Sequence, residues 1–221
     1  MLTDFFVKKR WLYICIGMIF FIVASFLSFA VYLSERVVIP LNKTFYYLVT
    51  STNHIEAGTY EAQLNGGAGY LLNCEDGAYV AVAVYLSEEV GKAVQQEMSN
   101  TSLIGVSVGD WQLINPKQHS YVNIYKNAMD CLYHCIEVLS MEIGRLDKGA
   151  TQQSSRATLQ ILQKQLAYLS NRYEEVFGAF TQVCRDASER IEHVLADTIF
   201  AKDLRNIMCQ LCDQYIQLTK I

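Results

Sequence analysis

An uninterrupted run without charged residues, from Trp11 to Leu33, is the feature that most constrains how this chain folds. A bilayer core about 30 Å thick is crossed by about 20 apolar residues in a helix, so the run predicts a transmembrane helix over 11–33. Lys8, Lys9 and Arg10 precede the run, which predicts a cytoplasmic basic tail over 1–10. We therefore expect a single-pass protein of the cytoplasmic membrane, with its N-terminus inside and its later domains extracytoplasmic.

A cleaved signal peptide is the alternative interpretation of this run. Ser28, Phe29 and Ala30 form a passable small-x-small cleavage site. The apolar core of a signal peptide usually covers about 7 to 15 residues, however, and this run is longer, which favours an uncleaved anchor in contact with membrane lipid. A juxtamembrane linker over 34–44 is expected to follow.

Charge argues against a nucleic-acid partner. The formal net charge is -4, and no cluster of Lys or Arg occurs beyond the N-terminal triplet. A nucleic-acid-binding protein usually carries a basic patch that neutralises phosphates. We therefore predict no nucleic-acid binding.

The cysteines leave two chemical alternatives open. Cys209-x-x-Cys212 and Cys131-x-x-x-Cys135 together have the ligands of a four-thiolate zinc site, and Cys209-x-x-Cys212 alone has the spacing of a redox pair. Most of the cysteines after the apolar run lie in sequence with helical periodicity, where a cysteine commonly packs as a small apolar residue. We expect reduced, buried thiols, with no metal and no cofactor.

A small α/β module is predicted over 45–116. Clusters of β-branched and aromatic residues predict strands over 45–50, 69–74, 79–85 and 103–108, and helix-compatible segments cover 54–64 and 88–98. The order is strand, helix, strand, strand, helix, strand, as in a ferredoxin-like split βαβ module. A weak internal repeat supports it, because aligning Val49 with Val82 brings Gly58 onto Gly91.

Residues 117–221 predict helices. Apolar residues recur with 4-3 spacing from Tyr125 to Leu146 and again from Leu159 to Val183, and a third, shorter stripe runs from Leu204 to Leu218. The second helix is expected to continue to about Phe200 despite Gly178, with Ser154 or Ser155 as its cap. An antiparallel three-helix bundle or a long helical hairpin is predicted, and the alternative use of these stripes is association with another chain. The predicted fold class is α+β, with an N-terminal transmembrane helix, a ferredoxin-like module and a C-terminal antiparallel helical bundle.

Catalytic motifs are missing from the sequence. It has no glycine-rich phosphate loop, no H-E-x-x-H and no G-x-S-x-G. The adjacent carboxylates Glu88-Glu89 and Glu174-Glu175 point in different directions on a helix, so neither pair faces one substrate. We predict a protein that is not an enzyme.

Three segments resemble the SPOR domain of bacterial cell-division and sporulation proteins. Phe45-Tyr46-Tyr47-Leu48-Val49 is similar to its opening strand, Gly67-Ala68-Gly69-Tyr70 to its helix-ending Gly-Tyr, and Tyr79 to Tyr85 to its third strand. The resemblance implies binding of peptidoglycan glycan strands on the exposed face of the sheet, and hence a role in cell division or sporulation.

Strand alternation assigns the faces of this sheet. Tyr47, Val49, Val80 and Val82 are expected to face the helices. The open, glycan-binding face then carries Tyr46, Leu48, Thr50, Tyr79, Ala81 and Ala83. The open alternative is that this face packs on the helical bundle. The second functional hypothesis is accordingly a membrane-anchored scaffold, in which the α/β module is structural and residues 117–221 recognise a partner protein or a second copy.

Overall fold

The computed structural model describes residues 18, 21–28, 37–50, 55–74, 77–113 and 121–219. The chain divides into two compact units, of which the larger comprises 39–111 and 121–221, and the smaller comprises 1–38 and 112–120. In the part of the chain that is described, β1 (Val37–Ile39) pairs with β6 (Trp111–Leu113) in a two-stranded sheet. Everything that follows concerns the larger unit unless stated otherwise.

The transmembrane helix predicted over 11–33 is not supported by the structure. Of that range the structure describes only Met18 and the helical segment Phe21–Ser28, and the other residues lie outside the description. Among the described residues, no helix is both long and apolar enough to cross a bilayer. The predicted fold is corrected accordingly, since the described residues do not support its transmembrane component. The predicted membrane topology, with the N-terminus inside and the later domains extracytoplasmic, relied on that helix and is not tested by the described residues.

The α/β part is built on a four-stranded antiparallel sheet with strand order β3-β4-β2-β5. This order, with one helix after β2 and one after β4, is the split βαβ topology expected from the sequence. The strands are β2 (Thr44–Thr50), β3 (Tyr70–Cys74), β4 (Gly77–Tyr85) and β5 (Thr101–Ser107), and the helices are α2 (Ile55–Leu64) and α3 (Glu88–Glu97).

Helices α2 and α3 pack on one face of the sheet. Ala62 of α2 is buried against Val80 and Val82 of β4. Gly91 lets α3 approach β5 closely, because a Cβ atom there would lie 2.8 Å from Cδ1 of Leu103. Small residues therefore set how closely these two helices approach the strands.

The C-terminal part is a bundle of helices α4 (Val122–Asp147), α5 (Gln152–Tyr173), α6 (Gly178–Ala196) and α7 (Ala201–Gln217). The expected second helix is thus two helices, α5 and α6. The backbone N–H groups of Val176 and Phe177 both donate to the carbonyl of Tyr173, which closes a turn. The Phe177 ring packs 4.7 Å from that of Tyr125, measured between centroids. The apolar 4-3 spacing continues through this turn, and that continuity concealed the break.

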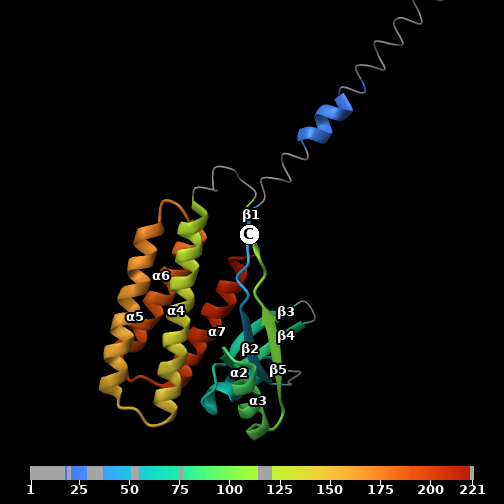
Figure 1. The fold of residues 1–221 in the computed structure, drawn as a ribbon. Helices are drawn as coiled ribbons and strands as arrows, with labels where there is room; N and C mark the ends of the chain where they lie inside the picture. The colour runs from blue at the N-terminus through green and yellow to red at the C-terminus, as the bar shows by residue number, and fades with distance from the viewer. Residues whose placement is uncertain are drawn as a thin grey trace, which may run out of the picture. The chain divides into compact units, whose positions relative to one another are not determined.

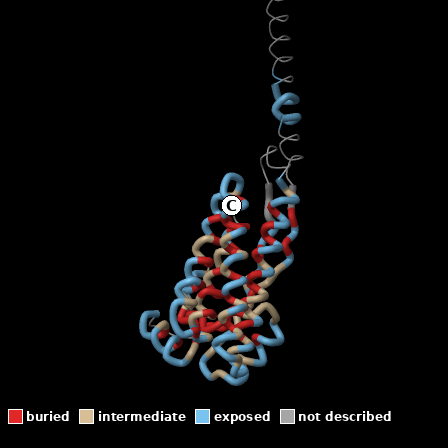
Figure 2. The backbone as a smooth tube through the Cα atoms, turned by 90° about the vertical axis from the view of Figure 1, so that its left-hand side faces the viewer, coloured by how far each residue is buried: buried red, intermediate tan, exposed pale blue. Residues whose placement is uncertain are grey.

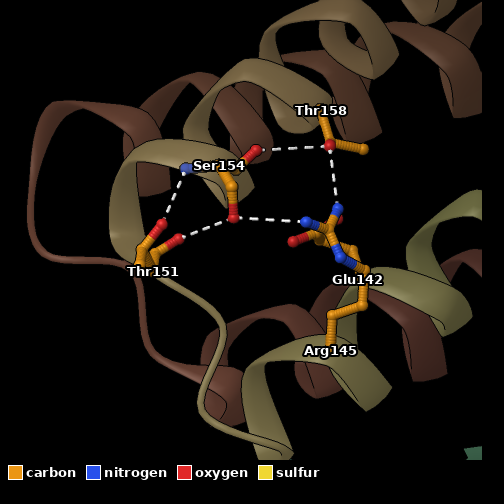
Figure 3. A network of polar contacts seen from close by, with 5 residues as sticks. All are labelled: Glu142, Arg145, Thr151, Ser154 and Thr158. Atoms are coloured by element: carbon orange, nitrogen blue, oxygen red, sulfur yellow. Dashed lines mark hydrogen bonds and ion pairs between the residues drawn. The ribbon is translucent and has the colours of Figure 1, made fainter.

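A polar network joins the end of α4 to the start of α5 (Figure 3). Arg145 donates to the buried carboxylate of Glu142 at 2.9 Å and to the hydroxyl of Ser154 at 3.2 Å. The helix cap is Thr151, whose side chain accepts from the backbone N–H of Ser154, so the expected cap at Ser154 or Ser155 is misplaced by a few residues. Arg145 thereby neutralises a buried acid and ties the two helices together.

The second face of the sheet is covered by α7, which contacts β3 and β4. The Phe45 ring of β2 lies 5.7 Å from Tyr215 of α7 and 6.2 Å from Tyr133 of α4. Phe45, Tyr47 and Tyr215 are fully buried, and Figure 2 shows that buried positions recur along both the strands and the helices of this unit. The sheet is therefore the middle layer between two layers of helices.

Replacing Phe45 with alanine tests how strongly this interface stabilises the unit. We expect Phe45→Ala to lower the free energy of unfolding by about 3 to 5 kcal/mol, because it leaves a cavity beside the two remaining rings, Tyr133 and Tyr215. Urea unfolding followed by circular dichroism measures the change. Phe200→Ala is the matched control, since this ring is 53% exposed, and its effect should be about 0.5 kcal/mol. Equal losses for the two variants would contradict the packing described.

Candidate protein interaction surfaces

The residues predicted to bind glycan do not share an open face. Leu48, Ala81 and Ala83 are buried, whereas Tyr46, Thr50 and Tyr79 are half-buried. Leu48 pairs with Ala83 and with Leu103, which faces α3. The set is also divided between the two faces: Tyr46, Leu48, Thr50 and Ala83 lie on the side of α2 and α3, and Tyr79 and Ala81 on the side of α7. The open-face assignment is therefore wrong.

A β-bulge in β4 explains the error. Leu48 is opposite Ala83, but the next residue, Val49, is opposite Ala81, so Val82 is an extra residue without a partner on β2. An extra residue inverts the alternation on one side of it. Regular alternation placed Tyr47 on the same side as Val82, whereas Tyr47 in fact lies beside Cys209 and Cys212 of α7.

Polar contacts between α7 and the α/β part reinforce the apolar packing. The Tyr70 hydroxyl donates to the Asp213 carboxylate at 2.8 Å, and burial together with this hydrogen bond raises the pKa of Tyr70. Arg205 donates to the carbonyl of Gly66 at 2.7 Å and to both carboxylate oxygens of Asp147 at 2.6 Å. Helix α7 thus holds the loop before β3 and the end of α4 in fixed positions.

Most of the described cysteines of this unit are packing residues. Cys135, Cys184, Cys209 and Cys212 are buried and in the thiol form, whereas Cys131 is exposed. Burial raises the pKa of Cys135 to about 12 and raises the pKa of Cys209 and Cys212 further, which disfavours the thiolate needed for metal binding or redox chemistry. Within the described ranges, no group of three or more His, Cys, Asp or Glu residues could hold a metal ion.

The solvent-open cavities of this unit include two that border helices of the bundle. One, of about 540 Å³, lies beside the start of α7 and carries charges of both signs, including Arg190, Lys202 and Asp203. The other, of about 400 Å³, is a mostly apolar groove with Val90 and Val94 of α3 on one side and Ile143 and Gly144 of α4 on the other. The first cavity is also lined by His193, Asp197 and Thr198, and in the described part of the chain no hydrogen bond joins the side chains of these three residues.

A more distinctive feature is the outward side of α5, called here the α5 surface: Ala157, Ile161, Lys164, Tyr168 and Arg172. Their spacing places them on one side of the helix. Ile161 is 68% and Tyr168 is 56% exposed. Helix α5 contains no Asp or Glu, so the charges on this surface are all positive. The nearest acid beyond it, Glu174, is paired with Arg185 at 2.9 Å.

The outward side of α2 has the opposite charge and is called here the α2 surface: Glu56, Ala57, Tyr60, Glu61 and Leu64. Tyr60 is 65% and Leu64 is 67% exposed, and the two lie one turn apart. Helix α2 contains no Lys or Arg. Two short amphipathic surfaces of opposite sign thus face solvent in the same unit.

Sequence reasoning did not single out either surface. The signal was present, because Ala157, Ile161, Lys164 and Tyr168 follow a 4-3-4 spacing parallel to the buried stripe of the same helix. Only the structure establishes which of the two stripes is buried.

Comparisons of this chain with protein-family models, with curated proteins and with solved structures find no match. The resemblance to the SPOR domain therefore stays a prediction.

Thiol reactivity tests the packing of α7 directly. In brief treatment of the folded protein with iodoacetamide at neutral pH, we expect Cys131 to be alkylated. The buried Cys135, Cys184, Cys209 and Cys212 should react only after unfolding in urea, because they are both inaccessible and protonated. Mass spectrometry of the digested protein measures modification at each site. Alkylation of Cys209 or Cys212 as fast as Cys131 in the folded protein would show that α7 is not seated on the sheet.

Proposed function

We propose that this protein is a non-catalytic scaffold that binds a partner protein through the α5 surface. The observation that carries the proposal is the exposure of Ile161 and Tyr168 on a helix whose charges are all positive. Such a surface suits a partner with complementary charge and a few apolar anchors.

A structural role for the α/β module supports this choice over glycan binding. Phe45 and Tyr47 of the sheet are fully buried on the side of α7, and Leu48 is fully buried on the side of α3. Glycan recognition by stacking requires an exposed aromatic face on the sheet, and both faces carry helices. The sheet then serves to support the helices, and recognition is left to the helices.

The chemistry of the α5 surface defines the partner. The surface is convex and helical, and its exposed apolar residues are separated by two turns, with Lys164 between them and Arg172 at one end. An amphipathic helix with apolar residues at 3-4 spacing can lie along it, and carboxylates beside that stripe would face the two cations. The proposed partner element is therefore an acidic amphipathic helix.

A designed peptide tests this proposal. The probe is a fluorescent helical peptide with leucines at 3-4 spacing flanked by glutamates, and its binding to the full chain is followed by fluorescence anisotropy. We expect Lys164→Glu with Arg172→Glu to weaken binding by about tenfold or more, because attraction between charges becomes repulsion. The control, Lys126→Glu in α4 with Lys148→Glu at the C-cap of α4, changes the net charge equally and should leave binding unchanged.

A second peptide, with lysines in place of the glutamates, sharpens the result. The proposal would be overturned if the acidic peptide bound the Lys164→Glu, Arg172→Glu protein as well as the unmodified chain, or if the two peptides bound equally. A failure of the acidic peptide to bind the unmodified chain would also overturn it.

A further inference from the structure

The α2 surface has the properties that the proposed function requires of a partner. It is helical and exposes Tyr60 and Leu64, and its charged residues, Glu56 and Glu61, are both acidic. At 3.6 residues per turn, Tyr60, Leu64 and Ala57 form the middle of this surface, and the two glutamates lie on either side of it. The chain therefore carries both an acidic amphipathic helix and a basic surface suited to such a helix.

The dimensions of the two surfaces agree. Along a helix axis, Ile161 and Tyr168 are about 10 Å apart, and Tyr60 and Leu64 are about 6 Å apart, at 1.5 Å per residue. The pair from α2 therefore fits between the pair from α5. Glu56 and Glu61 then lie on the flanks of the contact, within reach of the flexible side chains of Lys164 and Arg172.

The two surfaces of one molecule do not meet each other. Helix α2 contacts β3 and β4, whereas α5 contacts α4 and α6, and α7 and the sheet lie between them (Figure 1). Contact between α2 and α5 therefore requires two molecules.

Charge excludes the symmetric pairings. Two α5 surfaces facing each other would bring together Lys164 and Arg172 of both copies, and two α2 surfaces would bring together four glutamates. Like charges in direct opposition are repulsive. Pairing of α2 with α5 places opposite charges together and is the one combination that both surfaces favour.

We propose that the partner of the α5 surface is the α2 surface of a second copy of this chain, in a head-to-tail contact. The proposal rests on the proposed function and adds the identity of the partner. A head-to-tail contact is heterologous, so each bound copy presents a further free surface. One helix of ten residues covers less than the roughly 800 Å² per partner of a stable complex, so the association is weak and depends on concentration and salt.

Mixing two complementary variants tests the proposal. The α5 variant is Ile161→Asp with Lys164→Glu, and the α2 variant is Glu61→Lys with Leu64→Lys. All four positions are exposed, so both proteins should keep the melting temperature of the unmodified chain. Each variant retains one intact surface. In a head-to-tail contact, neither variant can bind itself, because its α2 and α5 surfaces then carry charges of the same sign. Unlike variants keep one unmodified pairing of α2 with α5.

The measurement is titration of one full-length variant, labelled at its N-terminus, with the other, followed by anisotropy at low salt. We expect unlike variants to bind with the affinity of the unmodified chain, and like variants to bind about tenfold more weakly or not at all. Association through the apolar run 11–33, which all these proteins share, would be equal in every mixture. Lys164→Glu with Arg172→Glu alone should abolish association. Adding Glu56→Lys and Glu61→Lys to the same chain should restore it.

Equal binding in like and unlike mixtures would overturn the proposal, as would an unmodified chain that stays monomeric or a four-fold charge exchange that restores nothing. These failures are distinguishable from failure of the proposed function. If the acidic peptide binds the α5 surface while the chain does not associate with itself, the scaffold proposal stands and the partner is a different protein.

Discussion

The burial of the second face of the sheet beneath α7 is the interaction on which the rest of this unit depends. Phe45, Tyr133 and Tyr215 form an aromatic cluster at the place where the sheet, α4 and α7 meet. Ring pairs of this kind add to the large apolar area that each ring removes from water. Without α7, the sheet would expose a broad apolar face. Without the sheet, α7 would lose a surface against which it packs.

The position of α7 also decides which surfaces remain for function. Cys209, Cys212 and Tyr47 face one another in a buried interface, where thiols are protonated and inert. At the margin of this interface, Arg205 donates to the Asp147 carboxylate and the Tyr70 hydroxyl donates to the Asp213 carboxylate. With the middle of the unit closed, α2 and α5 are among the elements that carry exposed apolar residues, and the charges of these two helices are opposite in sign. The proposed recognition at helix surfaces follows from a core that leaves the sheet no open face.

Local patterns in the sequence predicted the α/β elements well. The helix-compatible segment over 88–98 corresponds to α3, and clustered β-branched and aromatic residues marked the strands. Tertiary features were not predictable in this way. The bulge at Val82 inverts the faces of β2 relative to β4, and no local propensity distinguishes a bulged valine from a paired one. The apolar stripe through Val176 continued across a turn, and the apolar run at 11–33 had a suitable composition without giving a spanning helix among the described residues.

The candidate surfaces were likewise only partly predictable from the sequence. The sequence shows that α2 carries only acidic charges and α5 only basic ones. Both helices carry two apolar stripes, however, and packing alone determines which stripe is exposed. Ile161 and Leu162 are neighbours, yet Ile161 is 68% exposed and Leu162 only 1%. Adjacent residues of α5 thus lie on different sides of the helix, one in the core and one on the exposed surface.

Native-state hydrogen exchange tests most directly whether α7 makes the sheet and the bundle one cooperative unit. The amides of Tyr47 and Val49 in β2 should exchange with the same free energy of opening as those of Cys209 and Cys212 in α7, and all should respond equally to added urea. An opening free energy for β2 lower than that for α7 by more than about 2 kcal/mol would contradict the account, because the sheet would then unfold while the bundle stays intact.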